Sequence, residues 1–122
     1  MSARQQPEYR LQCRVVDLLD KLPCIVLYHH SPNGSKLYGN SAQRERTGAR
    51  LKRSGTKAGY PDLILYASEG RVGHLELKSE TGRLTDTQKA IQASLAAAGH
   101  RYAVVRHTDD VMAALAEWGW VS

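Results

Sequence analysis

Cysteine is scarce in this sequence of 122 residues, which contains Cys13 and Cys24 and no others. Two cysteines without a C-x-x-C spacing argue against a zinc site and against a disulfide-stabilised fold. We interpret both as small buried apolar residues in a reducing compartment. The default expectation is therefore a cytoplasmic protein.

Long hydrophobic runs are also missing. None approaches the roughly 20 apolar residues of a membrane span, so we expect no membrane partner. The first ten residues are polar and lack the apolar core of a secretory signal. With 42% hydrophobic and 24% charged residues, the composition is that of a globular chain rather than a disordered one. The length predicts one domain, residues 1–122, with one modest core.

Negative charge is nearly absent between His29 and Pro61, where Glu45 opposes seven basic residues. This segment carries +6, whereas the rest of the chain, with ten basic and eleven acidic residues, carries −1. A local basic excess is typical of polyanion binding, and the five glycines in the segment favour nucleic acid over a merely solvated face. The candidate nucleic-acid-binding residues are Lys36, Arg44, Arg46, Arg50, Lys52, Arg53 and Lys57.

Apolar periodicity and turn residues predict an α/β chain. An antiparallel hairpin followed by a strand–helix–strand crossover predicts a central mixed sheet flanked by helices. The helix between residues 72–78 and 101–106 predicts that these two strands pair in parallel. Helices are expected at 7–21, 41–53, 85–98 and 109–118, and strands at 24–28, 63–67, 72–78 and 101–106.

The hairpin brings chemically useful side chains together. If its turn centres on Glu69, residues at equal distances from that turn pair, and Asp62 lies opposite Glu76. Side chains alternate between the two faces of a strand, so Glu76 and Lys78 project from one face. The sequence thus predicts a cluster of two carboxylates and one ammonium group at the open end of the hairpin.

Such a cluster has two interpretations that spacing alone leaves open. Two carboxylates, completed by backbone carbonyls and water, form an oxygen site for Mg²⁺ or Mn²⁺, and such an ion polarises a phosphodiester. The neighbouring ammonium group would offset charge in the transition state. The alternative is a cross-strand surface ion pair worth less than about 1 kcal/mol.

Pro61-Asp62 followed by Glu76-Leu77-Lys78 resembles the motif of the PD-(D/E)xK nuclease superfamily. A wider string resembles the VRR-NUC family of that superfamily, in particular the stand-alone members that phages and bacteria encode. This string consists of residues 59–63, 76–79 and 81–85, with Gln88 and Gly99.

The resemblance implies a restriction-endonuclease-like fold and a metal-dependent endonuclease that hydrolyses DNA phosphodiesters. It also implies Mg²⁺ or Mn²⁺ as the cofactor, no small-molecule cofactor, and a bacterial or phage-infected host cell. Stand-alone relatives are suspected of resolving four-way junctions or other branched DNA as homodimers. Asp62 and Glu76 would be the metal-binding carboxylates, the Leu77 carbonyl a further ligand, and Lys78 the catalytic lysine.

Two further residues match the family pattern and have competing explanations. Gln88 matches a glutamine beside the catalytic site, but it also stands where it would form a capping box with Thr85. Glu8 matches an acidic residue that completes the metal shell in relatives, but it would equally be a favourable charge in a first helical turn.

Two other functions remain open beside the endonuclease. The same fold would serve as a non-catalytic module that binds nucleic acid, although two carboxylates facing a polyanion argue against this. Alternatively, the chain is a nuclease subunit that needs a larger partner.

Three further side chains have environments that the sequence leaves to packing. Trp118 and Trp120 either cover the sheet or form a subunit interface. His74 is expected at a half-exposed strand position on the face of Glu76.

Overall fold

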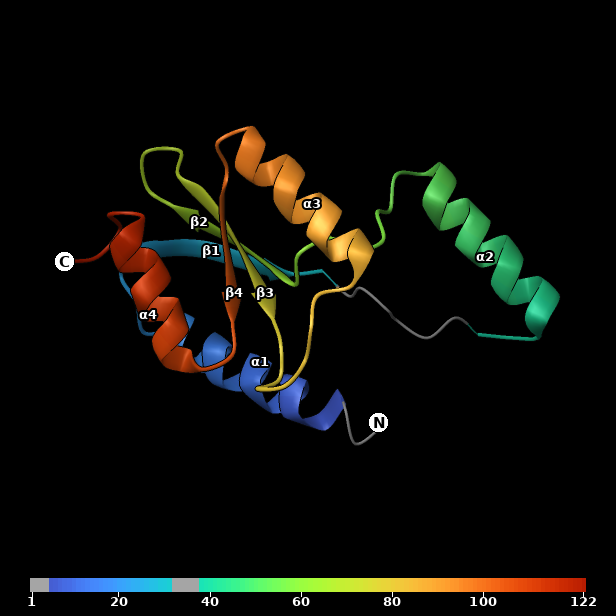
Figure 1. Ribbon diagram of the computed structural model, residues 1–122, viewed down its shortest axis with the longest axis horizontal. Helices are drawn as coiled ribbons and strands as arrows, with labels where there is room; N and C mark the ends of the chain where they lie inside the picture. Colours follow the sequence, from blue (N-terminus) through green and yellow to red (C-terminus); the bar gives the residue numbers. More distant parts are fainter. Residues whose placement is uncertain (1–4, 32–37) are drawn as a thin grey trace.

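The computed structural model describes residues 5–31 and 38–122, and its elements follow the predicted order (Figure 1). None of the described helices has the length and apolar character needed to cross a bilayer. The elements are α1 (Gln5–Leu19), β1 (Ile25–His30), α2 (Ser41–Arg53), β2 (Leu63–Ala67), β3 (Val72–Leu77), α3 (Asp86–Ala97), β4 (Arg101–Val105) and α4 (Thr108–Glu117).

Most element boundaries differ from the prediction by one or two residues, and two of these differences have a clear physical reason. Helix α1 starts at Gln5, ahead of Pro7, because the first amide groups of a helix have no partner within it and a proline is tolerated there. Strand β1 continues to His30, which pairs with Leu63 of β2. Backbone pairing thus extends this strand past the apolar run from which it was predicted.

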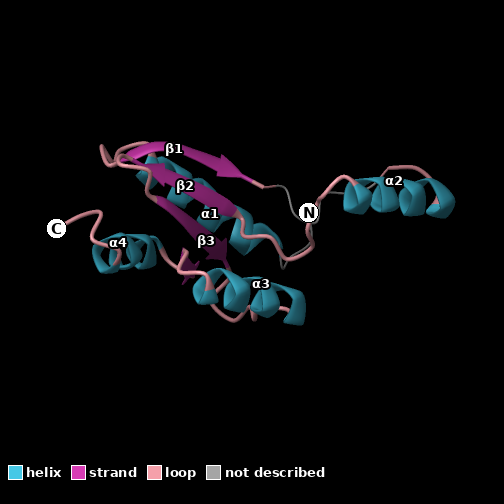
Figure 2. Cartoon of the chain, turned by 90° about the horizontal axis from the view of Figure 1, so that it is seen from above, coloured by secondary structure: helices cyan, strands magenta, loops and turns pink. Residues whose placement is uncertain are grey.

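The four strands form one sheet in the order β1-β2-β3-β4. The pairs β1–β2 and β2–β3 are antiparallel and β3–β4 is parallel, which confirms the predicted mixed sheet. Leu63 pairs with Leu75 in the hairpin, in the register expected for a turn centred on Glu69. Helices α1 and α4 cover one face of the sheet and α3 covers the other (Figures 1 and 2).

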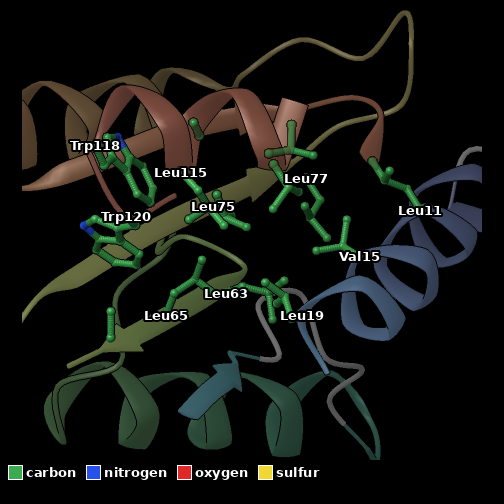
Figure 3. Close-up of a cluster of buried hydrophobic side chains, with 14 residues drawn as sticks. Leu11, Val15, Leu19, Leu63, Leu65, Leu75, Leu77, Leu115, Trp118 and Trp120 are labelled. Atoms are coloured by element: carbon green, nitrogen blue, oxygen red, sulfur yellow. The ribbon is translucent and has the colours of Figure 1, made fainter. Parts of the chain in front are cut away.

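The core lies between the sheet and the pair α1–α4 (Figure 3). Alternate strand residues supply one layer, and helix residues one turn apart supply the other. Burying each of these aliphatic side chains contributes about 1.5–3 kcal/mol. Ten of the core side chains are Leu11, Val15, Leu19, Leu63, Leu65, Leu75, Leu77, Leu115, Trp118 and Trp120.

The two tryptophans cover the sheet. Trp118 and Trp120 pack edge to face with ring centroids 5.1 Å apart, and the Trp118 ring lies directly over Gly73 of β3. Trp118 and Trp120 are only 9% and 7% exposed, which places both in the core of this chain.

The Gly73→Ala substitution is expected to lower the free energy of unfolding by about 1–3 kcal/mol, because the added methyl group would overlap the rigid Trp118 ring. Chemical denaturation monitored by tryptophan fluorescence measures the change. Gly70→Ala in the hairpin turn, where an added Cβ meets no atom but φ is +73°, separates backbone strain from overlap. A Gly73→Ala protein as stable as the wild type would contradict the close packing.

Two expectations about burial were wrong. Cys13 is exposed, because the buried face of α1 is set by Leu11 and Val15 and Cys13 lies on the opposite side. His74 is buried, because Tyr60 and His100 lie edge to face against its ring. The exposure of Cys13 follows from the rotation of α1 about its axis, and the burial of His74 follows from neighbours that are distant in the sequence.

Helix α2 stands apart from the rest of the chain (Figures 1 and 2). It is mostly polar and has no buried residue. Its first turn is nevertheless well capped, because the Asn40 side chain accepts a hydrogen bond from the Gln43 amide and the Gln43 side chain accepts one from the Asn40 amide. A capped basic helix without a buried face is held by its own hydrogen bonds and is free to present its surface to a partner.

Candidate functional site

Asp62 is fixed at the start of β2 by backbone contacts on both sides. Its carboxylate accepts a hydrogen bond from the Leu77 amide at 2.7 Å, across the open end of the hairpin. Its carbonyl accepts from the Ser31 amide at 2.8 Å, and His30 Nδ1 lies 3.1 Å away. One Asp62 carboxylate oxygen is thereby held towards β3, while the side chain remains partly exposed.

Glu76 lies opposite Asp62 on β3, as predicted, and is only 1% exposed. Its Oε1 accepts a hydrogen bond from Gln88 Nε2 at 2.8 Å. Its Oε2 is buried and has no hydrogen-bond donor among the described residues. A buried carboxylate oxygen without a donor is costly, so a proton or a cation is needed there.

The pKa of Glu76 reflects this need for a proton or a cation. Burial raises the pKa of Glu76 to about 8, and the neighbouring Asp62 carboxylate raises it further. Lys78 opposes the shift and Glu8 reinforces it. Glu76 therefore carries a proton at neutral pH when nothing else compensates its charge.

Lys78 and the Leu77 carbonyl complete the cluster. Lys78 follows β3 directly, and its amide donates to the Val105 carbonyl at 3.0 Å, which continues the pairing with β4. Its side chain is 9% exposed and close enough to lower the pKa of Glu76. Because a strand residue directs its amide and carbonyl to the same side, the Leu77 carbonyl faces the side of Asp62.

Gln88 forms the predicted capping box and also donates a hydrogen bond to Glu76. Its amide and its Oε1 form the capping box with Thr85, at 3.1 and 2.9 Å, while its Nε2 holds Glu76. Gly59 packs against this first turn of α3: an added Cβ would lie 2.9 Å from the Thr87 backbone, at a φ of +78°. The loop that leads to Asp62 is thus seated on the helix that orients Glu76.

Glu8 lies on the first turn of α1, near the loop that follows Lys78. Its Oε1 is 3.5 Å from the Ser79 amide, and its charge reaches Glu76. Glu8 and Lys78 line a cleft of about 730 Å³ together with residues 79–83. The charge at the end of the first turn also suits the helix dipole, so both interpretations of Glu8 stand.

The donor set suits a hard divalent cation without forming a complete cage. Asp62 and Glu76 supply carboxylate oxygens, one of them buried without a donor in the described part of the chain, and the Leu77 carbonyl lies on the same side. Within residues 5–31 and 38–122, no three His, Cys, Asp or Glu side chains converge on one point. A cation here would therefore keep several water or phosphate ligands, as Mg²⁺ commonly does.

Comparison with known proteins gives the family. A family model described as the VRR-NUC domain matches residues 6–109. The chain belongs to the VRR-NUC family. This is a family of nuclease domains in the PD-(D/E)xK class, as the motif around Asp62 and Glu76 indicated.

Solved structures agree with this assignment. A structure described as a VRR_NUC domain protein has 26% sequence identity and a TM-score of 0.68, over 92% of this chain and 87% of the other. A second, described as a VRR_NUC domain, has 18% identity and a TM-score of 0.60, over 91% and 95%, and supports the fold. No curated protein matches the chain.

The basic residues predicted to bind nucleic acid lie away from the carboxylates of this VRR-NUC chain. Five of them are on α2 and are exposed: Arg44, Arg46, Arg50, Lys52 and Arg53. Lys57 is exposed in the loop that follows, and Lys36 lies outside the described residues. Arg46 and Arg50 line a hollow of about 390 Å³ with Tyr38, which is 87% exposed.

Sequence reasoning missed Tyr102 of β4. It pairs with His74 and so lies on the face of Glu76, where its hydroxyl is buried without a partner among the described residues. Burial raises the pKa of Tyr102, and the charges of Glu76 and Asp62 raise it further. The parallel register of β3 and β4 was the signal that would have placed it beside the site.

Proposed function

We propose that this VRR-NUC chain is a metal-dependent endonuclease that hydrolyses DNA phosphodiesters, with branched DNA such as four-way junctions as its substrate. The observation that carries the proposal is the Asp62–Glu76 pair beside Lys78, in which one buried Glu76 oxygen receives no hydrogen bond from any residue that the structure describes. A carboxylate pair held together against its own repulsion, in a chain of a nuclease family, is best explained by a cation that binds both.

Mg²⁺ or Mn²⁺ would be held by Asp62, Glu76 and the Leu77 carbonyl, with Glu8 at the edge of the cleft. When bound, such an ion polarises the phosphodiester and makes water more acidic. The chain's own groups prepare the site for that chemistry. Gln88 fixes the orientation of Glu76 through the 2.8 Å hydrogen bond, and the Leu77 amide fixes that of Asp62.

Lys78 supplies the positive charge that is independent of the metal. Its nearly buried ammonium group lies close to the carboxylates, where it would orient the attacking water and stabilise the charge that develops on the phosphate oxygens. A positive group in a largely water-excluded position is more effective in this role than one on the surface.

Helix α2 would hold the nucleic acid outside the cleft. Its five basic side chains are exposed, it has no buried face, and it stands apart from the sheet (Figure 2). A projecting basic helix reaches a phosphate backbone at a distance from the cleaved bond. This arrangement supports a substrate that extends in more than one direction, as branched DNA does.

A homodimer would bring two sites to the two strands of such a substrate. The described chain provides one Asp62–Glu76–Lys78 cluster. Strand β1 is at the edge of the sheet, and its Val26 and Leu27 are 70% and 60% exposed, which supports an apolar contact with a second copy.

The proposal is tested by incubating supercoiled plasmid and a synthetic four-way junction with the protein, in Mn²⁺, Mg²⁺ or a chelator. Asp62→Asn is expected to lower the cleavage rate on the order of a hundredfold or more, because several kcal/mol of charge stabilisation depend on the metal site. Lys78→Ala is expected to act similarly, while junction binding persists in both variants.

Asp17→Asn on the exposed side of α1 is the matched control and should cleave as the wild type does. Undiminished cleavage by the Asp62 and Lys78 variants would remove this site from the reaction. Junction binding by the wild type without cleavage in any divalent metal would leave the chain a binding module.

A further inference from the structure

A second cavity, of about 330 Å³, lies between the first half of α1 and the start of α4 and adjoins the cleft lined by Glu8 and Lys78. Its walls include Arg10 and Arg14 of α1 and Arg106 and His107 before α4. It shares Pro7, Ser79 and Glu80 with the cleft that contains Glu8 and Lys78, so the two hollows form one continuous surface.

The charges in this cavity are mostly uncompensated. Arg10 and Arg14 lie one turn apart on the same side of α1, are exposed, and form no hydrogen bond or ion pair with any described residue. Glu80 is the one acidic residue among the described residues that line the cavity, and its carboxylate lies 3.8 Å from His107. Asp110 is occupied by the Arg106 and His107 amides, at 2.8 and 3.1 Å.

Arg106 fixes the boundary between the two hollows. Its Nη1 donates to the carbonyls of Ser79 and Gly82, at 2.7 and 2.6 Å, and more weakly to that of Glu80 at 3.4 Å. The loop after Lys78 is therefore anchored to the strand end beside α4. This anchoring keeps the arginine-lined cavity at a set distance from the carboxylate pair.

We propose that Arg10 and Arg14 bind a phosphate of the same nucleic-acid strand that enters the catalytic cleft. Two guanidinium groups at helical spacing that no described residue pairs with, in a hollow large enough for a phosphate and continuous with the cleft, fit a sugar–phosphate backbone. The strand then lies across residues 79–82, between this cavity and the Asp62–Glu76 pair. The inference rests on the proposed function, because it takes the nucleic acid to be the substrate of that cleft.

The test measures binding of a fluorescent four-way junction in a chelator over a range of salt concentrations. The double variant Arg10→Gln/Arg14→Gln is expected to bind about tenfold more weakly. The slope of log affinity against log salt is negative, and its magnitude should decrease by about 1–2 because fewer counterions are released. Lys21→Gln/Arg101→Gln removes the same charge from exposed positions outside both hollows and is the matched control.

The readout separates this inference from the nuclease proposal. A reduced salt slope in the arginine variant alone supports the phosphate site, even if the wild type cleaves nothing. An equal loss in both double variants, or an unchanged slope in the arginine variant, overturns it even if cleavage is normal. Equal thermal unfolding midpoints of the two double variants establish that the comparison concerns the surface and not the fold.

Discussion

Glu76→Gln is expected to lower metal-dependent DNA cleavage on the order of a thousandfold and, at the same time, to raise the stability of the metal-free protein. In the proposed mechanism activity falls because the neutral amide cannot act as a carboxylate ligand, and several kcal/mol of transition-state stabilisation would be lost with the metal. Stability rises because the wild-type fold has to bury Glu76 at 1% exposure beside Asp62, whereas glutamine needs no proton there.

The two effects are measured separately. Single-turnover cleavage of the junction gives the rate, and denaturant unfolding in a chelator at pH 7 gives the stability, with a gain of about 1–3 kcal/mol expected from the raised pKa. Glu117→Gln at the exposed end of α4 is the control and should change neither quantity. A variant that is both inactive and unstable would indicate that Glu76 supports the fold rather than the chemistry.

The stability of the metal-free protein is expected to contain a term that decreases as the pH rises from about 4.5 to about 8. Glu76 has an ordinary pKa of 4.5 when unfolded, and burial raises its pKa in the folded state to about 8. Between these values the folded state binds more protons than the unfolded state, so raising the pH favours unfolding. The term is fully present below the lower pKa and lost as the pH passes the upper one.

The difference between wild type and Glu76→Gln isolates this term. Burial lowers the pKa of His74, which gives an opposite slope near its ordinary value of 6.5, but both proteins contain that histidine. The difference in the free energy of unfolding between the two proteins should therefore grow by a few kcal/mol as the pH rises from about 4.5 to about 8. Added Mn²⁺ should stabilise the wild type increasingly as the pH rises, since it binds the deprotonated carboxylate. A gap that stays constant with pH would show that Glu76 is ionised in the metal-free fold.

Much of the site could be read from the sequence because its geometry is local. The turn at Glu69 sets which residues of the hairpin face each other, so the pairing of Asp62 with Glu76 follows from counting along two short strands. The capping box of Thr85 and Gln88 is equally local, since it involves residues three apart. The wider motif string then indicated the family, which the match over residues 6–109 confirms.

Packing settled what depends on elements distant in sequence. Outside the basic segment the charges of the chain sum to nearly zero, and this sum does not show where in space each charge lies. Arg10, Arg14 and Arg106 line one hollow only because α1 packs next to the start of α4. Likewise, the hydrogen bond from Gln88 to Glu76 and the contact of His100 with His74 depend on α3 lying on that face. Strand alternation fixes the face a side chain takes, whereas its solvation and partners are fixed by whatever covers that face.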